Sequence, residues 1–321
     1  MNEIFLSNEV ITYLLSEIVL YILLLIAAIA TVGILKGWNF DHFTEKQFVL
    51  ENRSYLVMSI IFFVLGLKIV LLPYFAYTID SLSVLVPGAM CAAGVIDANG
   101  YGDPLLVLKI MILFVSGLWL RVNRIDLGEK SYPYMKLKSW FFLLIFILLS
   151  VEVVLDILYF SHIETTKPVS CCSVIFGELG GNTLPFGLDI KKLLILFYLL
   201  YILSVLMLHS QRYVMRVAVM LFFGLIAYYS IVYFFGTYIY ELPTHRCPFC
   251  MLQAEYFYVG YILWGLLFMG MFLAIESVVL EGVFGKNALK LKKVSIGLLT
   301  LFVLLCSSYV GIYYLKNGVF L

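Results

Sequence analysis

Eight apolar runs, each long enough to cross a membrane as a helix, dominate this sequence. A bilayer core about 30 Å thick needs roughly 20 apolar residues per helix. The runs lie near residues 10–35, 54–77, 105–121, 139–160, 192–209, 214–240, 255–280 and 294–315. Because 63% of the 321 residues are hydrophobic and 13% are charged, the chain lacks the polar side chains that a water-soluble surface needs. We therefore expect an all-α integral membrane protein, a polytopic bundle of about eight transmembrane helices.

Basic residues between the runs predict the orientation, because Lys and Arg are retained on the cytoplasmic side of a membrane. With the N-terminus outside, fourteen Lys and Arg residues fall in inner segments and five in outer segments. The outer five are Lys167, Lys191, Lys192, Arg246 and Lys316. We therefore predict a multi-pass protein of the cell (inner) membrane with both termini outside. The segments about 78–104, 161–191 and 241–254 then face the periplasm.

The polar segments are short. The largest two, about 78–104 and 161–191, could not enclose a core of their own. We therefore expect residues 1–321 to form a single integral membrane domain in contact with the lipid bilayer. A net charge of +1 without a basic patch excludes nucleic acid as a partner, because phosphate binding depends on clustered Lys and Arg.

Five of the six cysteines fall in the three predicted periplasmic segments. Each segment contains the pattern Pro-x-x-x-Cys, at Pro87 to Cys91, Pro168 to Cys172 and Pro243 to Cys247. Thiols outside the cytoplasm meet oxidising conditions, in which disulfides form and persist. Five thiols cannot all pair with one another, so at least one of them stays reduced, binds a metal ion or pairs elsewhere.

The motif Cys247-Pro-Phe-Cys250 favours thiol–disulfide exchange. We place it where the chain enters the run 255–280. A helix N-terminus stabilises a thiolate through its dipole and free amides, and Cys-x-x-Cys pairs commonly exchange disulfides. His245 and Arg246 precede the motif and add positive potential.

The remaining cysteines differ in character. Cys171 and Cys172 are neighbours in sequence, and a disulfide between them would be a strained ring that is readily reduced. Such a pair suits a transient mixed disulfide or a thiophilic metal ion. Cys306 lies within the last apolar run, where a cysteine most simply serves as a small apolar core residue.

The segment HRCPFCMLQAE, residues 245–255, resembles the quinone-linked membrane proteins of the DsbB and vitamin K epoxide reductase group. The resemblance is confined to this segment and to the placement of cysteines in outer segments. It implies a thiol–disulfide oxidoreductase in which Cys247 and Cys250 form the disulfide nearest a membrane electron acceptor, with a quinone as the candidate cofactor. A second set, Cys91, Cys171 and Cys172, would exchange electrons with a periplasmic thiol partner. At residues 253–255 this chain has Gln-Ala-Glu, where the DsbB branch has an Arg.

Two other interpretations use the same segments. Thiolate, thioether and imidazole ligands together select Cu(I) and similar soft ions. The outer segments hold such a set in Met90, Cys91, Cys171, Cys172, His245, Cys247, Cys250 and Met251. The chain would then handle copper for a periplasmic metalloprotein partner. In the third interpretation, disulfides link the outer segments to one another, and the chain is a structural membrane subunit.

Ionisable residues inside the apolar runs are a second set of candidates, because each costs about 2.5–3.5 kcal/mol at the bilayer centre on insertion scales. Lys68 lies in the second run, Lys109 in the third, and Glu152 and Asp156 in the fourth. Glu152 and Asp156 are four residues apart and so share a helix face. Lys68 and Glu152 fall at similar depth. We expect either an ion pair that locks two helices together or a proton path that continues through Asp156 to His162.

Overall fold

The computed structural model describes residues 3–38, 44–129, 132–169 and 187–321. Within these ranges the ordered elements are helices, and eight of them are long and apolar enough to cross a membrane. This confirms the predicted all-α polytopic membrane bundle. The chain divides into two compact units, unit 1 (Met1–Val169) and unit 2 (Ser170–Leu321). The single domain expected over residues 1–321 stays a prediction.

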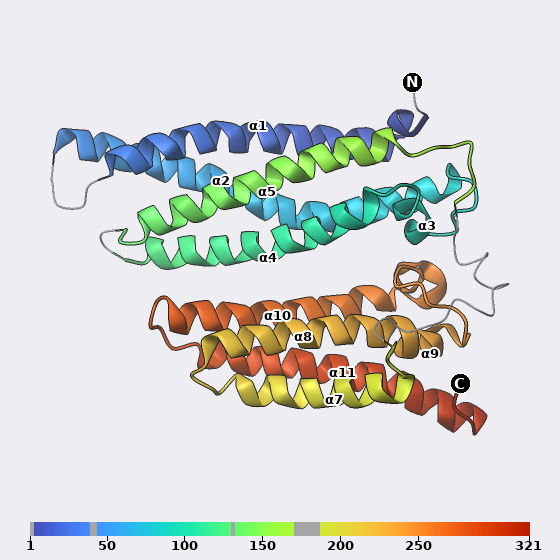
Figure 1. Ribbon diagram of the computed structural model, residues 1–321. Helices are drawn as coiled ribbons and strands as arrows, with labels where there is room; N and C mark the ends of the chain where they lie inside the picture. The colour runs from blue at the N-terminus through green and yellow to red at the C-terminus, as the bar shows by residue number, and fades with distance from the viewer. Residues whose placement is uncertain (1–2, 39–43, 130–131, 170–186) are drawn as a thin grey trace. The chain divides into compact units, whose positions relative to one another are not determined.

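Unit 1 contains four long helices, which can be followed in Figure 1. They are α1 (Asn8–Gly37), α2 (Glu45–Ser81), α4 (Gly102–Leu127) and α5 (Met135–Ser161). The short elements are η1 (Glu3–Leu6), η2 (Leu82–Val84) and α3 (Ala92–Ile96). Helix α1 packs against α2 and α5, and α4 packs against the same two helices, so the four helices close into a ring.

The interior of unit 1 is mostly apolar, with two polar interruptions. Leu24, Leu65, Trp119 and Phe142 are buried in one hydrophobic cluster to which all four long helices contribute. Near the end of α4, the ammonium of Lys138 lies 2.6 Å from Asp126 Oδ2, and both side chains are buried. Lipid tails are as apolar as leucine, so packing and polar contacts, rather than the release of water, decide which helices associate. The second interruption is the charge cluster described below.

Unit 2 also contains four long helices, which can be followed in Figure 1. They are α7 (Ile190–Met207), α8 (Tyr213–Ser230), α10 (Val259–Gly282) and α11 (Leu289–Asn317). Helix α8 continues through the π-helical turn η4 (Ile231–Phe235) into α9 (Gly236–Tyr240). Two short 3₁₀ turns, η5 (Cys250–Leu252) and η6 (Ala254–Tyr256), precede α10. Helix α8 packs against α7 and α10, and α10 packs against α11.

An aromatic group centred on Phe197 of α7 fills the interior of unit 2. Its ring centroid lies 5.8 Å from that of Phe223, 5.1 Å from Phe235 and 6.2 Å from Phe302, which come from α8, η4 and α11. Tilted and edge-on pairs at such separations contribute about 0.5–1.5 kcal/mol each beyond the area that they bury. Phe197 therefore joins three of the other elements of the unit.

The positions of the eight apolar runs agree with the helices, while several ends differ. Helix α2 begins at Glu45, before the predicted run 54–77, because polar residues extend the helix beyond its apolar part. Helix α10 begins at Val259 rather than near 255. Phe257 and Tyr258 have φ angles of 53° and 55°, and this left-handed conformation cannot continue a right-handed helix.

Two of the predicted periplasmic segments lie side by side in unit 1. The backbone N–H of Val169 donates a hydrogen bond to the carbonyl oxygen of Pro87 at 2.9 Å. Gly88 has φ 82°, and a Cβ atom at this position would lie 2.6 Å from the carbonyl oxygen of Val169. Glycine is therefore needed both for the backbone conformation and for the close approach. Cys171 and Cys172, which follow at once, lie outside the described residues.

We predict that Gly88→Ala lowers the free energy of unfolding by more than about 1 kcal/mol, because alanine at a positive φ is strained and its Cβ would clash with Val169. Gly100→Ala is the matched control, since Gly100 lies in the same segment with open space at its Cβ position and outside the left-handed region. Thermal unfolding of both variants in detergent micelles measures the difference. Equal unfolding temperatures would contradict the prediction.

Candidate functional site

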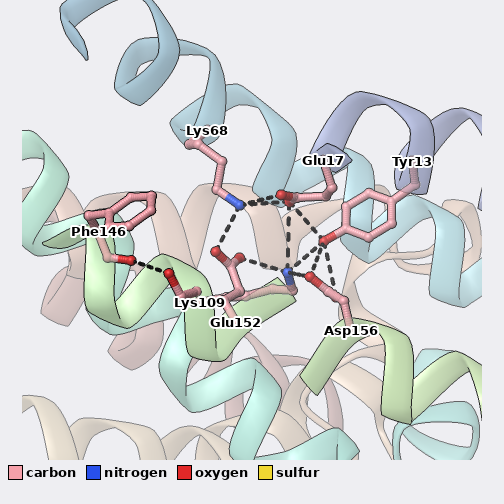
Figure 2. A network of polar contacts seen from close by, with 8 residues as sticks. Tyr13, Glu17, Lys68, Lys109, Phe146, Glu152 and Asp156 are labelled. Atoms are coloured by element: carbon pink, nitrogen blue, oxygen red, sulfur yellow. Dashed lines mark hydrogen bonds and ion pairs between the residues drawn. The ribbon is translucent and has the colours of Figure 1, made fainter. Parts of the chain in front are cut away.

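Six polar side chains meet between the four long helices of unit 1, and we call them the charge cluster (Figure 2). They are Tyr13 and Glu17 of α1, Lys68 of α2, Lys109 of α4, and Glu152 and Asp156 of α5. All six are buried. Tyr13 and Glu17 are four residues apart, as are Glu152 and Asp156, so each pair projects from one face of its helix.

Lys68 joins three helices through its ammonium group. The Nζ atom lies 2.7 Å from Oε1 and 2.6 Å from Oε2 of Glu17. It also lies 2.8 Å from Oε2 of Glu152. The sequence analysis expected Lys68 and Glu152 to meet, and the structure places them in contact, with Glu17 as an additional partner.

Lys109 completes the cluster from the opposite side. Its Nζ atom donates to Oε1 of Glu152 at 2.7 Å, to Oδ2 of Asp156 at 2.9 Å and to the hydroxyl oxygen of Tyr13 at 2.5 Å. An ammonium group has three N–H donors, and these contacts use all three. The same Nζ atom lies 4.5 Å from the centre of the Phe75 ring, within the range of a cation–π interaction.

The hydroxyl group of Tyr13 lies between two carboxyl groups. Its oxygen is 3.0 Å from Oε1 of Glu17 and 3.2 Å and 3.1 Å from the two carboxyl oxygens of Asp156. Tyr13 therefore connects Glu17 of α1 to Asp156 of α5.

The charge cluster contains one more acidic group than basic groups. Oxygens of Glu17, Glu152 and Asp156 lie within 4.8 Å of one another, a spacing that could hold a metal ion. The ammonium groups of Lys68 and Lys109 already contact these oxygens at hydrogen-bond distance, so they supply positive charge where a metal ion would sit. We therefore interpret the cluster as an ion-pair network rather than as a metal centre.

Part of this network was predicted from the sequence, namely Lys68, Lys109, Glu152 and Asp156. His162 was also predicted but is not one of the residues that meet. His162 is exposed, its Nδ1 lies 2.8 Å from the carbonyl oxygen of Leu158, and its ring packs against Tyr101. Glu17 was missed, although an acidic residue within the first apolar run is itself a signal.

We predict that Lys68→Met destabilises the protein far more than Glu17→Gln. The first variant leaves three carboxyl groups with one ammonium group, and removing one partner of a buried pair typically costs about 3–5 kcal/mol. The second leaves two carboxylates with two ammonium groups, and the amide can still accept hydrogen bonds. Thermal unfolding in detergent micelles measures both variants, and similar losses of stability would contradict the charge count.

Cys247 and Cys250 lie in unit 2, in the segment between α9 and α10. Their Sγ atoms are within 4.8 Å of each other. The backbone N–H of Phe249 points at Cys247 Sγ with an N–S distance of 3.4 Å. No disulfide joins Cys247 to Cys250. The two sulfurs therefore face each other across a short turn, and a thiolate at Cys247 would have a hydrogen-bond donor.

Tyr240, the last residue of α9, holds this turn in place. Its hydroxyl group donates a hydrogen bond to the carbonyl oxygen of Cys247 and accepts one from the backbone N–H of Met251 at 3.1 Å. Its ring packs against those of His245 at 4.3 Å and Tyr256 at 4.7 Å between centroids. Burial raises the pKa of Tyr256, and the nearby Cys250 sulfur and Glu255 carboxylate raise it further, so this phenol stays protonated.

The prediction that a helix begins at the cysteine motif is wrong. Cys250 begins the three-residue 3₁₀ turn η5, whereas α10 starts only at Val259. The left-handed residues Phe257 and Tyr258 separate the two elements. A helix dipole acts within the first turn of its helix, so α10 does not supply it to these sulfurs.

Aromatic residues and a cation surround the motif within unit 2. The indole Nε1 of Trp264 donates to the carbonyl oxygen of Pro248 at 3.4 Å, and the Trp264 ring stacks on Phe268 with centroids 5.9 Å apart. The guanidinium of Arg246 lies 4.9 Å from the centre of the Tyr233 ring. Its Nε and Nη1 groups have no hydrogen-bond acceptor among the described residues.

The other residues of the predicted soft-metal set have different surroundings. Met90 is 60% exposed, whereas Cys91 is buried at the start of α3. Met251 is buried, and its side chain packs against Gly260, where a Cβ atom would lie 2.6 Å from Met251 Cγ. Cys306, buried in α11, fits the core role expected for it. A copper site stays a prediction.

No protein-family model matches this chain, and no curated protein or solved structure is detectably similar to it. The fold defines the class, a multi-pass helical membrane protein. The resemblance of residues 245–255 to the DsbB and vitamin K epoxide reductase group stays an expectation from those residues alone. The geometry of the two sites therefore carries the inference about function.

We predict that Tyr240→Phe loosens the cysteine turn, because the Cys247 carbonyl and the Met251 N–H lose their shared partner. Leaving a buried polar group unsatisfied costs about 1–3 kcal/mol. The measurement is the rate at which Cys247 and Cys250 react with a thiol-alkylating reagent, which should rise. Tyr258→Phe is the control, since Tyr258 is 56% exposed in the same segment. Equal rates in the two variants would contradict a role for the Tyr240 hydroxyl group.

Proposed function

We propose that this chain is a multi-pass inner-membrane thiol–disulfide redox protein that uses Cys247 and Cys250 to pass electrons from periplasmic thiols to a membrane acceptor. The observation that carries the proposal is the approach of the two Sγ atoms to within 4.8 Å in a Cys-x-x-Cys turn. A disulfide has an S–S bond of about 2.05 Å, so a modest rotation of the two side chains suffices to form it.

The surroundings of Cys247 support its assignment as the attacked or attacking sulfur. The N–H of Phe249 points at its Sγ atom, and Arg246 precedes it in the chain. Hydrogen-bond donors and cations favour the thiolate, which is the nucleophile in disulfide exchange. Cys250 then acts as the resolving thiol of the pair.

The reaction balances in two steps. In the first step, a periplasmic thiolate attacks the Cys247–Cys250 disulfide and forms a mixed disulfide with one of the two cysteines. A second periplasmic thiol then attacks this mixed disulfide and releases the cysteine. The two periplasmic thiols are thereby joined in one disulfide, and the Cys247–Cys250 pair becomes a dithiol. The dithiol then transfers two electrons and two protons to an acceptor of the quinone class, which becomes a hydroquinone. The disulfide of Cys247 and Cys250 is thereby restored.

An apolar acceptor of this class fits the side chains next to the motif. Trp264 contacts Pro248, stacks on Phe268 and lies 6.0 Å from the Tyr228 ring, so aromatic surface continues from the motif into the apolar helices. Arg246 offers N–H donors that have no acceptor among the described residues, and a quinone carries two carbonyl oxygens. Arg246, which precedes the cysteine pair, would thus supply the positive charge that the DsbB branch carries on an Arg after its cysteine pair.

The orientation is part of the same proposal. The excess of Lys and Arg on one side of the eight spans favours both termini and all three cysteine segments on the periplasmic side. Oxidising conditions there allow Cys247 and Cys250 to cycle.

We expect the full-length protein, equilibrated with mixtures of reduced and oxidised dithiothreitol, to show a two-electron couple between Cys247 and Cys250. Alkylation followed by peptide mass spectrometry measures the linked fraction. The couple should disappear in Cys247→Ser and Cys250→Ser and persist in Cys306→Ala, which removes a cysteine buried in α11.

The membrane step has its own readout. With dithiothreitol as reductant and a short-chain benzoquinone as acceptor, the wild-type protein should reduce the quinone, and both serine variants should lose this activity. Cys247 and Cys250 that stay reduced in every mixture would overturn the proposal. Stoichiometric copper in the purified protein would overturn it as well, in favour of metal handling.

A further inference from the structure

We propose that the charge cluster of unit 1 is a proton-binding site that holds one exchangeable proton at neutral pH, carried by Asp156 and shared with Tyr13 and Glu17. The proposal concerns unit 1 and does not depend on the redox function, whose residues lie in unit 2.

The count of charges requires one additional positive charge. Glu17, Glu152 and Asp156 contribute three carboxyl groups, while Lys68 and Lys109 contribute two ammonium groups, and all five side chains are buried among membrane-spanning helices. A net charge in such a medium is far more costly than a neutral set of ion pairs. One proton makes the cluster neutral.

The count of hydrogen bonds points the same way. The Tyr13 oxygen lies within hydrogen-bond distance of both Glu17 and Asp156, yet the phenol has one proton to donate. A proton on Asp156 resolves this conflict, because the Asp156 hydroxyl donates to Tyr13 while Tyr13 donates to Glu17. The three groups then form a continuous hydrogen-bonded chain from α5 to α1.

The ion-pair geometry selects Asp156 as the carrier. Both carboxyl oxygens of Glu17 contact the ammonium group of Lys68. One carboxyl oxygen of Glu152 contacts the ammonium group of Lys68, and the other contacts that of Lys109. Among the described residues, Asp156 meets one ammonium group, that of Lys109, through Oδ2. It is therefore the carboxyl group with the weakest ammonium pairing.

All the groups that face Asp156 are accounted for among the described residues. Tyr13 and Glu17 face it from α1, Lys68 from α2, Lys109 from α4, and Glu152 and Tyr159 from its own helix. The contacts with Lys109 and Tyr13 are direct hydrogen bonds.

A second observation, independent of the acidic residues, points to a ligand at this site. Ser116 of α4 is fully buried, and its Oγ atom has no hydrogen-bond partner among the described residues. It lines a cavity of about 10 Å³ that is also lined by Tyr13, Glu17, Lys68, Lys109 and Glu152. A cavity of about 10–15 Å³ holds one water molecule if polar partners surround it. A water here would satisfy Ser116 and contact the cluster.

The polar face of α4 continues beyond Ser116. Lys109, Ser116 and Asn123 recur every seven residues and so lie on one side of the helix. Asn123 and Lys138 line a larger cavity of about 360 Å³ in unit 1. Ser116 and Asn123 are about 10.5 Å apart along the helix at a rise of 1.5 Å per residue. Ser116 is the residue of this polar face that lines the small cavity beside the cluster, and the proton exchanges through the water at Ser116.

Infrared spectroscopy of the full-length protein in lipid bilayers tests the bound proton. We expect a carbonyl band from a protonated carboxyl group at neutral pH, where exposed carboxyl groups are ionised. Asp156→Asn and Glu17→Gln should each abolish the band, because two carboxylates then match two ammonium groups. Lys68→Met should increase it about twofold, since the same charge count then calls for two protons. Glu164→Gln, at an exposed ion pair, is the control and should leave the band unchanged.

The absence of the band in the wild-type protein, or its persistence in Asp156→Asn, would overturn the proposal. A cluster neutralised by an alkali cation would instead show no band and a stability that depends on Na⁺ concentration, which would also overturn it.

The rate at which the band shifts after transfer to D₂O tests the water position. Ser116→Ala should retain the band and slow its shift severalfold. Ser139→Ala is the matched control, because Ser139 is buried and lacks a partner among the described residues but lies about 20 Å along α5 from Glu152. An unchanged exchange rate in Ser116→Ala would overturn the route through Ser116.

Discussion

The cost of charge in an apolar medium is the constraint on which unit 1 depends. Lipid tails are as apolar as leucine, so the apolar surfaces of its four long helices do not by themselves determine which helices pair. Lys68 and Lys109 remove this ambiguity, because each needs carboxyl partners that come from other helices. Lys68 ties α2 to α1 and α5, and Lys109 ties α4 to α5 and, through Tyr13, to α1. The cluster holds three carboxyl groups and two ammonium groups, so the side chains that join the helices also provide a place for a proton.

Unit 2 relies on different interactions. Phe197 joins the aromatic side chains of three other elements, and Arg216 of α8 pairs with Glu281 of α10 at 2.7 Å. The cysteine turn depends on Tyr240, which holds two backbone groups that would otherwise be unsatisfied. Tyr240 and Trp264 hold this turn through its backbone groups, and the two sulfurs lie within 4.8 Å of each other.

Hydropathy was sufficient to predict the helices, because apolar runs of about 20 residues have few alternatives in a membrane. The depth of Lys68 and Glu152 along their helices was also sufficient to bring them together. Tyr13 could not be found in this way, since a tyrosine in an apolar run resembles an ordinary core or interfacial residue. The start of α10 was missed because nothing in the residue types of Phe257 and Tyr258 indicates a left-handed backbone. A sequence pattern describes composition and spacing, whereas the left-handed backbone of Phe257 and Tyr258 depends on tertiary contacts.

The most direct test of the account is a distance measurement in the charge cluster, by solid-state NMR of the full-length protein in lipid bilayers. Labelling the lysine Nζ atoms with ¹⁵N and the side-chain carboxyl carbons of aspartate and glutamate with ¹³C reports which ammonium groups touch which acids. We expect a buried lysine nitrogen in contact with both a glutamate and an aspartate carboxyl carbon, and loss of the aspartate contact in Asp156→Asn. Lysine nitrogens that are all solvated, with no carboxyl carbon at hydrogen-bond distance, would contradict the cluster and the packing that depends on it.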